Sequence, residues 1–368
     1  MGNFAWIGTW AITNRCNLSC TYCQPRRLPA SAHENIDYGR AVKSIGEIRP
    51  KVLNISGGEP SLVRDIADIL RQIKEDWDPF IRIVSNGTRT GDLASCIPWF
   101  DRLVVSLDGL GETNRKTRGV DGYRVLEETR KFRDEALERG GELPEIVINE
   151  VVTVENADEV RALAEAVREI DPGIEIALSA LIPNDHPLSI SRHPQVWDRF
   201  WKTYEALRSE GFPIWEHFGY FKTCKPVRML VCYNQFFVVR FRPDGTPVSC
   251  SPDFAEATRH GGKYFREILR RPYLIPKAAG RLAHLAAGAV SRKPRFRCGT
   301  PCNCESWIDF LITGTDHSNL DYYLKPLWGR LSREEVERAV TWIKTYVNPG
   351  FPEGKLDPLI GKRSRGQE

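Results

Sequence analysis

The stretch Cys16-Asn-Leu-Ser-Cys20-Thr-Tyr-Cys23 places three thiols within eight residues, directly after the apolar run Phe4–Ile12. Three cysteines at this spacing can hold one small metal centre from a single loop. They leave one coordination position open, which is typical of a site built for chemistry rather than for structure. We therefore take this cysteine loop, residues 16–23, as the feature around which the rest of the chain is arranged.

The composition is that of a folded, globular protein. Of its 368 residues 41% are hydrophobic and 27% charged, and the net charge of +4 gives no reason to expect nucleic-acid binding. No apolar run approaches the ~20 residues of a membrane span. Nine of the ten cysteines fall in two groups, residues 16–23 and 224–304, and only Cys96 stands apart. Without an export signal, such clusters indicate metal or redox sites in a reducing cytoplasm.

Short apolar runs alternate with longer helical patterns from residue 4 to about residue 210. The strand candidates are Trp6–Ile12, Val52–Ser56, Ile81–Ser85, Leu103–Leu107, Glu145–Val152 and Ile174–Leu181. The helix candidates are Asp37–Ile48, Leu62–Lys74, Leu93–Trp99, Tyr123–Arg139, Ala157–Ile170 and Gln195–Glu210. This alternation predicts βαβ units with a parallel sheet. The expected fold class is α/β, a partial (βα)6 TIM-like barrel with its site at the carboxyl ends of the strands.

Glycine-rich and polar motifs follow the predicted strands. The residues concerned are Gly57-Gly58-Glu59 after the second strand, Ser85 and Asn86 after the third, and Ser106 and Asp108 after the fourth. A glycine pair lets the backbone approach a ligand closely, and a glutamate can accept hydrogen bonds from an ammonium group. Each residue type is also common in ordinary turns and helix caps, so that alternative stays open for each position.

Together these features resemble the radical S-adenosylmethionine (radical SAM) superfamily, whose Cys-x3-Cys-x-aromatic-Cys motif is matched by Cys16, Cys20, Tyr22 and Cys23. The resemblance implies a 4Fe-4S cluster on the three cysteines, with S-adenosylmethionine on the open iron. It also implies cofactor contacts from Tyr22, Gly57, Gly58, Glu59, Ser85, Asn86, Ser106, Asp108 and Arg118. Arg118 opens an Arg-Gly-x-x-Gly stretch similar to one that is common after the fourth strand. A structural zinc site is the alternative for the cysteines, and a structural role is the alternative for Arg118.

In the second cysteine group, Cys232 and Cys250 flank a predicted hairpin, Phe236–Phe241 and Pro247–Cys250 around an Asp244-Gly245 turn, which would bring them together. Its spacing resembles the auxiliary-cluster domains called SPASM and twitch, which implies one auxiliary 4Fe-4S cluster. The candidate ligands are Cys232, Cys250, Cys298 and either Cys302 or Cys304. The remaining thiol could donate hydrogen or be inert, and zinc is again the alternative metal.

The expected domains are a radical SAM barrel over 4–215, a SPASM/twitch-like domain over 224–310, and a C-terminal helix and polar tail over 311–368. The second domain consists of a β-hairpin and helices, with a basic helical insertion at 263–297. That insertion is expected to pack on the barrel with a solvated basic face, and peripheral contact with an anionic membrane is the alternative.

The resemblance implies an enzyme that cleaves S-adenosylmethionine reductively and uses the resulting 5′-deoxyadenosyl radical to abstract hydrogen from a substrate. A reductant such as flavodoxin or ferredoxin would supply the electron. Because the first predicted strand begins near the start of the chain, we expect no preceding peptide-recognition domain, which favours a small-molecule substrate, such as a lipid or sugar-like compound. A peptide or protein maturase is the alternative within this chemistry. A non-catalytic iron–sulfur or zinc protein is the alternative outside it.

Overall fold

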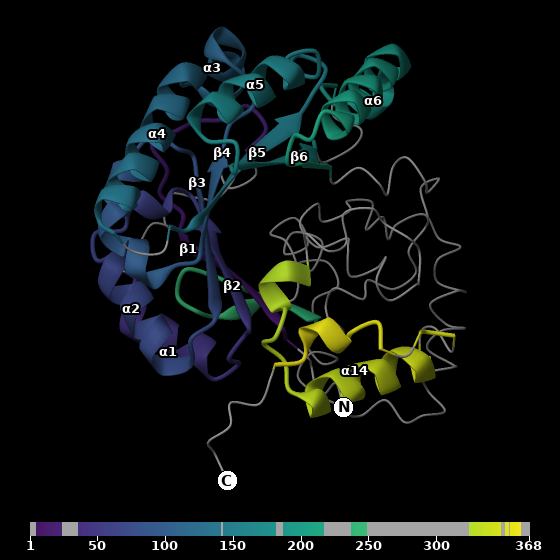
Figure 1. The fold of residues 1–368 in the computed structure, drawn as a ribbon. Helices are drawn as coiled ribbons and strands as arrows, with labels where there is room; N and C mark the ends of the chain where they lie inside the picture. Colours follow the sequence, from purple (N-terminus) through teal and green to yellow (C-terminus); the bar gives the residue numbers. More distant parts are fainter. Residues whose placement is uncertain are drawn as a thin grey trace, which may run out of the picture.

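The computed structural model describes residues 5–23, 36–140, 143–181, 187–216, 237–248, 324–346, 350–352 and 354–361. In this part of the chain, a curved sheet carries a layer of helices along its outer face (Figure 1). A smaller C-terminal group of helices lies at one end of the sheet, shown in yellow in Figure 1. No helix of the described residues is long and apolar enough to cross a membrane.

The sheet has the strand order β7-β6-β5-β4-β3-β2-β1-β8-β9. All neighbouring strands are parallel except β8 and β9, which pair antiparallel. The strands are β1 Ile7–Thr13, β2 Val52–Gly57, β3 Phe80–Ser85, β4 Arg102–Ser106, β5 Glu145–Val152, β6 Glu175–Ala180, β7 Ile214–Glu216, β8 Val238–Phe241 and β9 Pro247–Val248. This topology confirms the predicted α/β fold with a partial TIM-like barrel.

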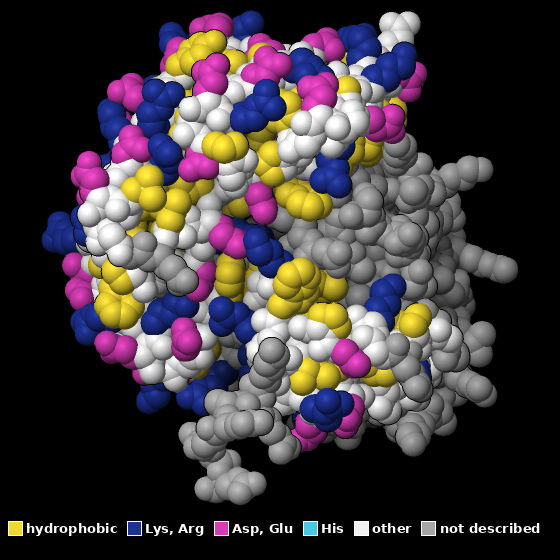
Figure 2. All heavy atoms as spheres, viewed as in Figure 1, with side chains coloured by type: hydrophobic (Ala, Val, Ile, Leu, Met, Phe, Trp, Pro, Cys, Tyr) yellow, Lys and Arg dark blue, Asp and Glu magenta, His cyan; other side chains and the backbone are white. Residues whose placement is uncertain are grey.

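The helices connect successive parallel strands and cover one face of the sheet (Figure 1). They are α1 Tyr38–Gly46, α2 Ile66–Trp77, α3 Gly111–Arg118, α4 Gly122–Glu138, α5 Val160–Ile170 and α6 Pro194–Ser209, whereas α14 Arg333–Tyr346 belongs to the C-terminal group. Short 3₁₀ helices are η3 Pro60–Leu62, η4 Thr90–Trp99, η5 Ile190–Arg192, η7 Lys325–Leu327 and η8 Asp357–Leu359. On the face seen in Figure 2, acidic and basic side chains are interspersed over these outer helices.

The main hydrophobic core lies between the sheet and the helices. Alternate strand residues such as Ile81 and Ile83 of β3 point into it, as the two-residue period of a strand requires. Helix α5 contributes Leu163, Ala164 and Val167, which share one helix face because they are three or four residues apart. Each large aliphatic side chain buried in this way contributes about 1.5–3 kcal/mol.

The inner face of the barrel is closed at the amino-terminal ends of the strands by C-terminal residues. Leu324, Leu327 and Leu331 pack in one cluster with Ile7 of β1 and Val52 of β2. An ion pair joins the two parts of the chain at the same end, with the Lys325 ammonium 2.6 Å from a carboxylate oxygen of Glu145. The carboxyl ends of the strands, at the opposite end, are where the predicted site residues lie.

Four elements differ from the sequence-based expectation, and one of them is the strand β7, which was not predicted. Helix α3 was not predicted, because its buried residues include Asn114, Thr117 and Arg118 and it carries no apolar stripe. The expected helix at Leu93–Trp99 is part of the 3₁₀ helix η4, which contains Pro98. The predicted hairpin is present as β8 and β9, but β8 also pairs with β1 and so extends the barrel sheet. The domain boundaries themselves stay a prediction.

Candidate functional site

The cysteine loop follows β1 directly and lies at the carboxyl end of the sheet. None of its three cysteines forms a disulfide; Cys16 is exposed, Cys20 buried and Cys23 half-buried. Burial raises the pKa of the Cys20 thiol; the Arg118 guanidinium opposes this, while neighbouring Cys23 adds to it. The three thiols therefore share one neighbourhood in which a bound cluster would replace their protons.

The glycine pair after β2 is required by the cysteine loop itself. Gly57 has a φ of 127°, and a Cβ there would lie 2.3 Å from the carbonyl oxygen of Thr13. A Cβ on Gly58 would lie only 2.0 Å from the carbonyl oxygen of Arg15. The Gly58 amide donates to Thr13 O at 2.6 Å, and the Glu59 amide donates to Arg15 O at 2.8 Å. The end of β2 thus fixes the backbone that leads into Cys16.

The Glu59 carboxylate is fully buried and joins the ends of β2 and β3. Its Oε1 accepts from the Ser61 amide at 3.1 Å and from the Ser85 hydroxyl at 2.9 Å. Its Oε2 accepts from the Asn86 amide at 2.7 Å. A carboxylate offers about four acceptor sites, so these three hydrogen bonds leave room for one further donor.

The side chain of Asn86 reaches back to the cysteine loop. Its Nδ2 lies 2.8 Å from Asn17 Oδ1 and 3.8 Å from the sulfur of Cys16. Its Oδ1 accepts from both the amide and the hydroxyl of Thr88, at 3.0 and 2.7 Å. The end of β3 is therefore in direct contact with a predicted cluster ligand.

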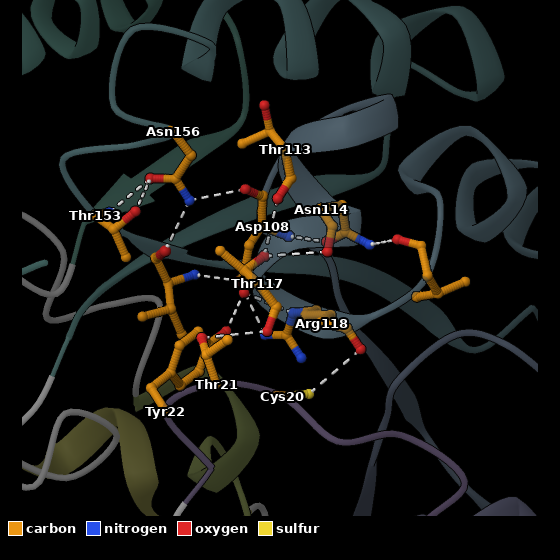
Figure 3. A network of polar contacts seen from close by, with 12 residues as sticks. Cys20, Thr21, Tyr22, Asp108, Thr113, Asn114, Thr117, Arg118, Thr153 and Asn156 are labelled. Atoms are coloured by element: carbon orange, nitrogen blue, oxygen red, sulfur yellow. Dashed lines mark hydrogen bonds and ion pairs between the residues drawn. The ribbon is translucent and has the colours of Figure 1, made fainter.

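Asp108, just after β4, is the centre of the polar network in Figure 3. It is fully buried, and Arg118 forms a bidentate pair with it through Nε at 2.7 Å and Nη2 at 2.9 Å. The Val151 amide donates to its Oδ1 at 2.9 Å, and the Tyr22 hydroxyl donates to its Oδ2. These four hydrogen bonds use the acceptor sites of the carboxylate.

The same network holds the second half of the cysteine loop. The Thr21 amide donates to the carbonyl oxygen of Thr117 in α3 at 2.9 Å, and the Arg118 guanidinium lies 5.8 Å from the centre of the Tyr22 ring. Burial, together with the Asp108 carboxylate, raises the pKa of Tyr22. Burial lowers the pKa of Arg118, but Asp108, Tyr22 and Cys20 together outweigh it, so the pKa is raised. Both side chains keep their protons at neutral pH.

Ser106 and its neighbours lie at the carboxyl ends of β4, β5 and β6. Ser106 is half-buried and in register with Asn149 of β5, whose Oδ1 accepts from the Ser179 hydroxyl at 2.8 Å. Asn149 and Ser179 are not among the predicted site residues, although their position on predicted strands was an available signal. Asn156 was also missed; its amide donates to the carbonyl oxygen of Asp108 at 2.8 Å.

A buried carboxyl group lies close to this network without joining it. Glu150 of β5 is fully buried, and neither of its oxygens has a hydrogen-bond partner among the described residues. Burial raises the pKa of Glu150 well above its usual range; Asp108 and Glu159 add to the effect, and Arg118 opposes it. Burial thus favours the protonated, uncharged form of Glu150.

The predicted ligands of the second metal centre lie outside the described residues. These are Cys232, Cys250, Cys298, Cys302 and Cys304, and the basic insertion at 263–297 lies outside as well. Gly245 of the preceding turn is described and packs against α1, where its carbonyl oxygen accepts from the Ser44 hydroxyl at 2.9 Å. The auxiliary cluster stays a prediction.

The first cysteine group fits an iron–sulfur cluster by the chemistry of its donors. Among the described residues, no three His, Cys, Asp or Glu side chains converge closely enough to hold a single metal ion. A cubane cluster does not need such convergence, because each thiolate binds a different iron and the sulfurs surround the cluster. Three cysteines on one loop, outside any disulfide and held by neighbouring strand ends, meet that requirement.

Comparison with known proteins supports this assignment of the barrel. Residues 10–167 match the family model described as Radical SAM superfamily. A probable GTP 3′,8-cyclase of Methanopyrus kandleri is 31% identical over 181 residues, which cover 46% of this chain and 54% of that protein. A GTP 3′,8-cyclase of Limosilactobacillus fermentum is 34% identical over 127 residues, which cover 32% of this chain and 38% of that protein. The chain thus spans about half, or less, of the length of these curated relatives.

Solved structures share the fold at low sequence identity. The crystal structure of Streptococcus suis SuiB bound to S-adenosylmethionine aligns with a TM-score of 0.51 at 15% identity, covering 67% of this chain and 60% of that one. Native anSMEcpe with bound AdoMet aligns with a TM-score of 0.50 at 16% identity, covering 66% and 74%. The matched segment 10–167 contains both the cysteine loop and the strand-end motifs that hold it, and over this segment the chain is similar to the radical SAM superfamily.

Proposed function

We propose that this chain is a radical SAM enzyme that abstracts hydrogen from a small-molecule substrate. The observation that carries the proposal is the double attachment of the cysteine loop. Gly58 holds its beginning through a 2.6 Å hydrogen bond to Thr13, and Asp108 holds its end through Tyr22. A loop fixed in this way presents Cys16, Cys20 and Cys23 at the carboxyl end of the barrel, where such folds carry their sites.

The residues of the chain then have distinct roles. Cys16, Cys20 and Cys23 would hold a 4Fe-4S cluster, and Glu59 has one acceptor site left for the amino group of S-adenosylmethionine. With both groups bound, reductive cleavage of the cofactor would supply a 5′-deoxyadenosyl radical. The full hydrogen bonding of Asp108 favours a supporting role for this residue over the direct ribose contact that the resemblance implies.

The inner face of the barrel supplies further polar groups for the cofactor and substrate. Ser106, Asn149 and Ser179 lie on the adjacent strands β4, β5 and β6, and the Ser179 hydroxyl donates to Asn149 Oδ1. In this proposal Ser85, Ser106 and Arg118 also contact the cofactor. The barrel would hold the reacting carbon close to the radical and exclude competing hydrogen donors.

A small molecule is the substrate class we propose. The name of the Methanopyrus kandleri relative states a reaction on GTP, a small molecule, and that relative is similar over the same barrel. The likeness to SuiB and anSMEcpe is a likeness of fold alone and gives no reason to prefer a peptide substrate. An auxiliary 4Fe-4S cluster on the second cysteine group, a flavodoxin or ferredoxin reductant and a cytoplasmic location complete the proposal.

Anaerobic reconstitution tests the activity directly. The full-length chain with iron, sulfide and a reductant should convert S-adenosylmethionine to 5′-deoxyadenosine, measured by chromatography. It should bind about eight irons, and a Cys16→Ala/Cys20→Ala/Cys23→Ala variant about four, since each cubane holds four. Cys96→Ala is the matched control, because Cys96 is a buried free cysteine outside both groups and should leave the iron content unchanged. Full iron loading without 5′-deoxyadenosine would instead identify an electron-transfer protein.

A further inference from the structure

The contact between Asn86 and Cys16 is independent of any substrate. Asn86 lies just after β3 and Cys16 in the loop after β1, and the carboxamide nitrogen is 3.8 Å from the sulfur. Sulfur is large and its hydrogen bonds are long, so this distance is that of an N–H···S contact. The sequence predicts that Asn86 contacts the cofactor, whereas in the structure its side chain contacts the cysteine loop.

The orientation of the Asn86 carboxamide is determined by its neighbours. Thr88 donates to Oδ1 twice, from its amide at 3.0 Å and from its hydroxyl at 2.7 Å. Two donors on one atom identify that atom as the oxygen, so the opposite atom is the NH₂ group. One of its hydrogens faces Asn17 Oδ1 at 2.8 Å, and the other is free to face the sulfur of Cys16. The hydroxyl of Thr88 also accepts from Asn17 Nδ2 at 2.8 Å, which closes a ring of three side chains.

Cys16 differs in this respect from Cys20. The sulfur of Cys16 faces two N–H donors, the Asn86 carboxamide and the Leu18 amide at 3.4 Å. The sulfur of Cys20 instead lies 4.0 Å from the carbonyl oxygen of Arg118, which can accept but not donate. A thiolate at Cys16 would therefore be stabilised by hydrogen bonds, and a thiolate at Cys20 would lose the contact it makes as a thiol.

We propose that Asn86 is a positioning residue that tunes the catalytic cluster through an N–H···S hydrogen bond to the Cys16 thiolate. This inference rests on the proposed function. Reduction places one more electron on the cluster and increases the negative charge on its thiolates. A donor to the sulfur stabilises the reduced form more than the oxidised form and raises the reduction potential. The ring with Asn17 and Thr88 holds the donor in place in both states.

The backbone at this position does not depend on the side chain. The Asn86 amide is held by Glu59 Oε2 at 2.7 Å, a contact that every substitution except proline retains. Asn86→Leu replaces the carboxamide by an apolar group of similar shape. Asn86→Asp exchanges the NH₂ group for an oxygen of nearly the same size. Both variants remove the donor to Cys16 while the main chain keeps its attachment.

The test is a redox titration of the reconstituted full-length protein without S-adenosylmethionine, followed by electron paramagnetic resonance of the singly reduced cluster. The Cys16-loop cluster is assigned by comparison with a Cys232→Ala/Cys250→Ala variant, which keeps only that cluster. For Asn86→Leu we expect the equilibrium constant for one-electron reduction to fall about tenfold, a shift of about 59 mV. Asn86→Asp should shift it further in the same direction because it also adds negative charge.

Thr88→Val is the matched control. It removes the hydroxyl from the ring, but the Thr88 amide still fixes Oδ1 and the NH₂ group still faces Cys16. Its reduction constant should stay within about twofold of the wild type, on the scale where tenfold is about 59 mV. An equal shift in Thr88→Val and Asn86→Leu would show a general loosening of the loop and overturn the proposal.

A spectroscopic readout completes the test. In D₂O, the exchangeable deuteron of the donor should couple to the reduced cluster in electron–nuclear double resonance spectra. That coupling should be absent in Asn86→Leu and present in Thr88→Val. An unchanged potential and an unchanged coupling in Asn86→Leu would refute the inference. Should Asn86→Leu bind less iron, Asn86→Asp supplies the same comparison. Neither readout requires turnover, so an inactive protein with shifted potentials would refute the proposed function and leave this inference standing.

Discussion

Replacing Asp108 should destabilise the protein far more than replacing an aspartate of the same geometry on the surface. Asp108→Ala leaves the Arg118 guanidinium, which is 7% exposed, without its carboxylate partner. Breaking a buried ion pair from one side costs about 3–5 kcal/mol, because the remaining charge stays desolvated. The lost hydrogen bonds from Tyr22 and the Val151 amide act in the same direction. We therefore expect the free energy of unfolding to fall by about 3–5 kcal/mol.

The chain offers a matched control for this substitution. Asp158 forms the same bidentate fork with Arg199, at 3.0 and 2.8 Å, but their side chains are 62% and 52% exposed. Asp158→Ala should cost less than about 1 kcal/mol, the usual value for an exposed pair. Since the two forks share their chemistry and geometry, the difference between the two variants measures the effect of burial.

Urea denaturation followed by circular dichroism measures these differences. The assay includes Arg118→Met and the double variant Asp108→Ala/Arg118→Met, so that a thermodynamic cycle isolates the pair itself. We expect the double variant to be more stable than the sum of the single changes predicts, by at least about 2 kcal/mol. An additive cycle, or a cost of Asp108→Ala close to that of Asp158→Ala, would refute the reasoning.

Two further substitutions test other features of the site. Gly58→Ala should reduce the iron bound by the cysteine loop, because its Cβ would lie 2.0 Å from the Arg15 carbonyl oxygen. Iron analysis measures this. The control is Gly91→Ala, whose Cβ meets nothing within 4 Å and which should bind iron normally. Glu150→Gln should remove a pH dependence of stability. The raised pKa of Glu150 means that the wild type loses stability as the pH rises from about 4.3 towards that pKa, by at most about 1.4 kcal/mol per pH unit. Urea midpoints from pH 5 to 8 should therefore favour the variant increasingly; parallel curves would contradict the assignment.

Local patterns were enough to place the barrel strands. The sequence predicts β5 at Glu145–Val152, as observed, and β2 at Val52–Ser56, one residue short of its end. Apolar runs bounded by glycine and polar residues determine such strands without knowledge of their neighbours. The pairing of β8 with β1 was not predictable in the same way, because it joins residues far apart in the chain and leaves no local signal.

The site residues were predictable as a group but not in their contacts. Strand-end position correctly brought together Gly58, Glu59, Asn86 and Asp108 around the cysteine loop. The glycine pair was explained by close approach of a ligand, whereas the structure shows close approach of the loop backbone. Sequence alone does not reveal how many hydrogen bonds a carboxylate already makes, so Asp108 could not be distinguished from Glu59, which keeps an acceptor site.

The attachment of the C-terminal residues to the barrel has a consequence for both flanks of residues 249–323. Residues 249–323 lie between β9 and Leu324. β9 pairs with β8, which in turn pairs with β1. Leu324 packs against Ile7 of β1 and Val52 of β2 at the amino-terminal ends of the strands. The described residues that flank this segment, Val248 and Leu324, are thus both attached to the barrel, and detaching either one would break contacts made through β8, β1 or β2.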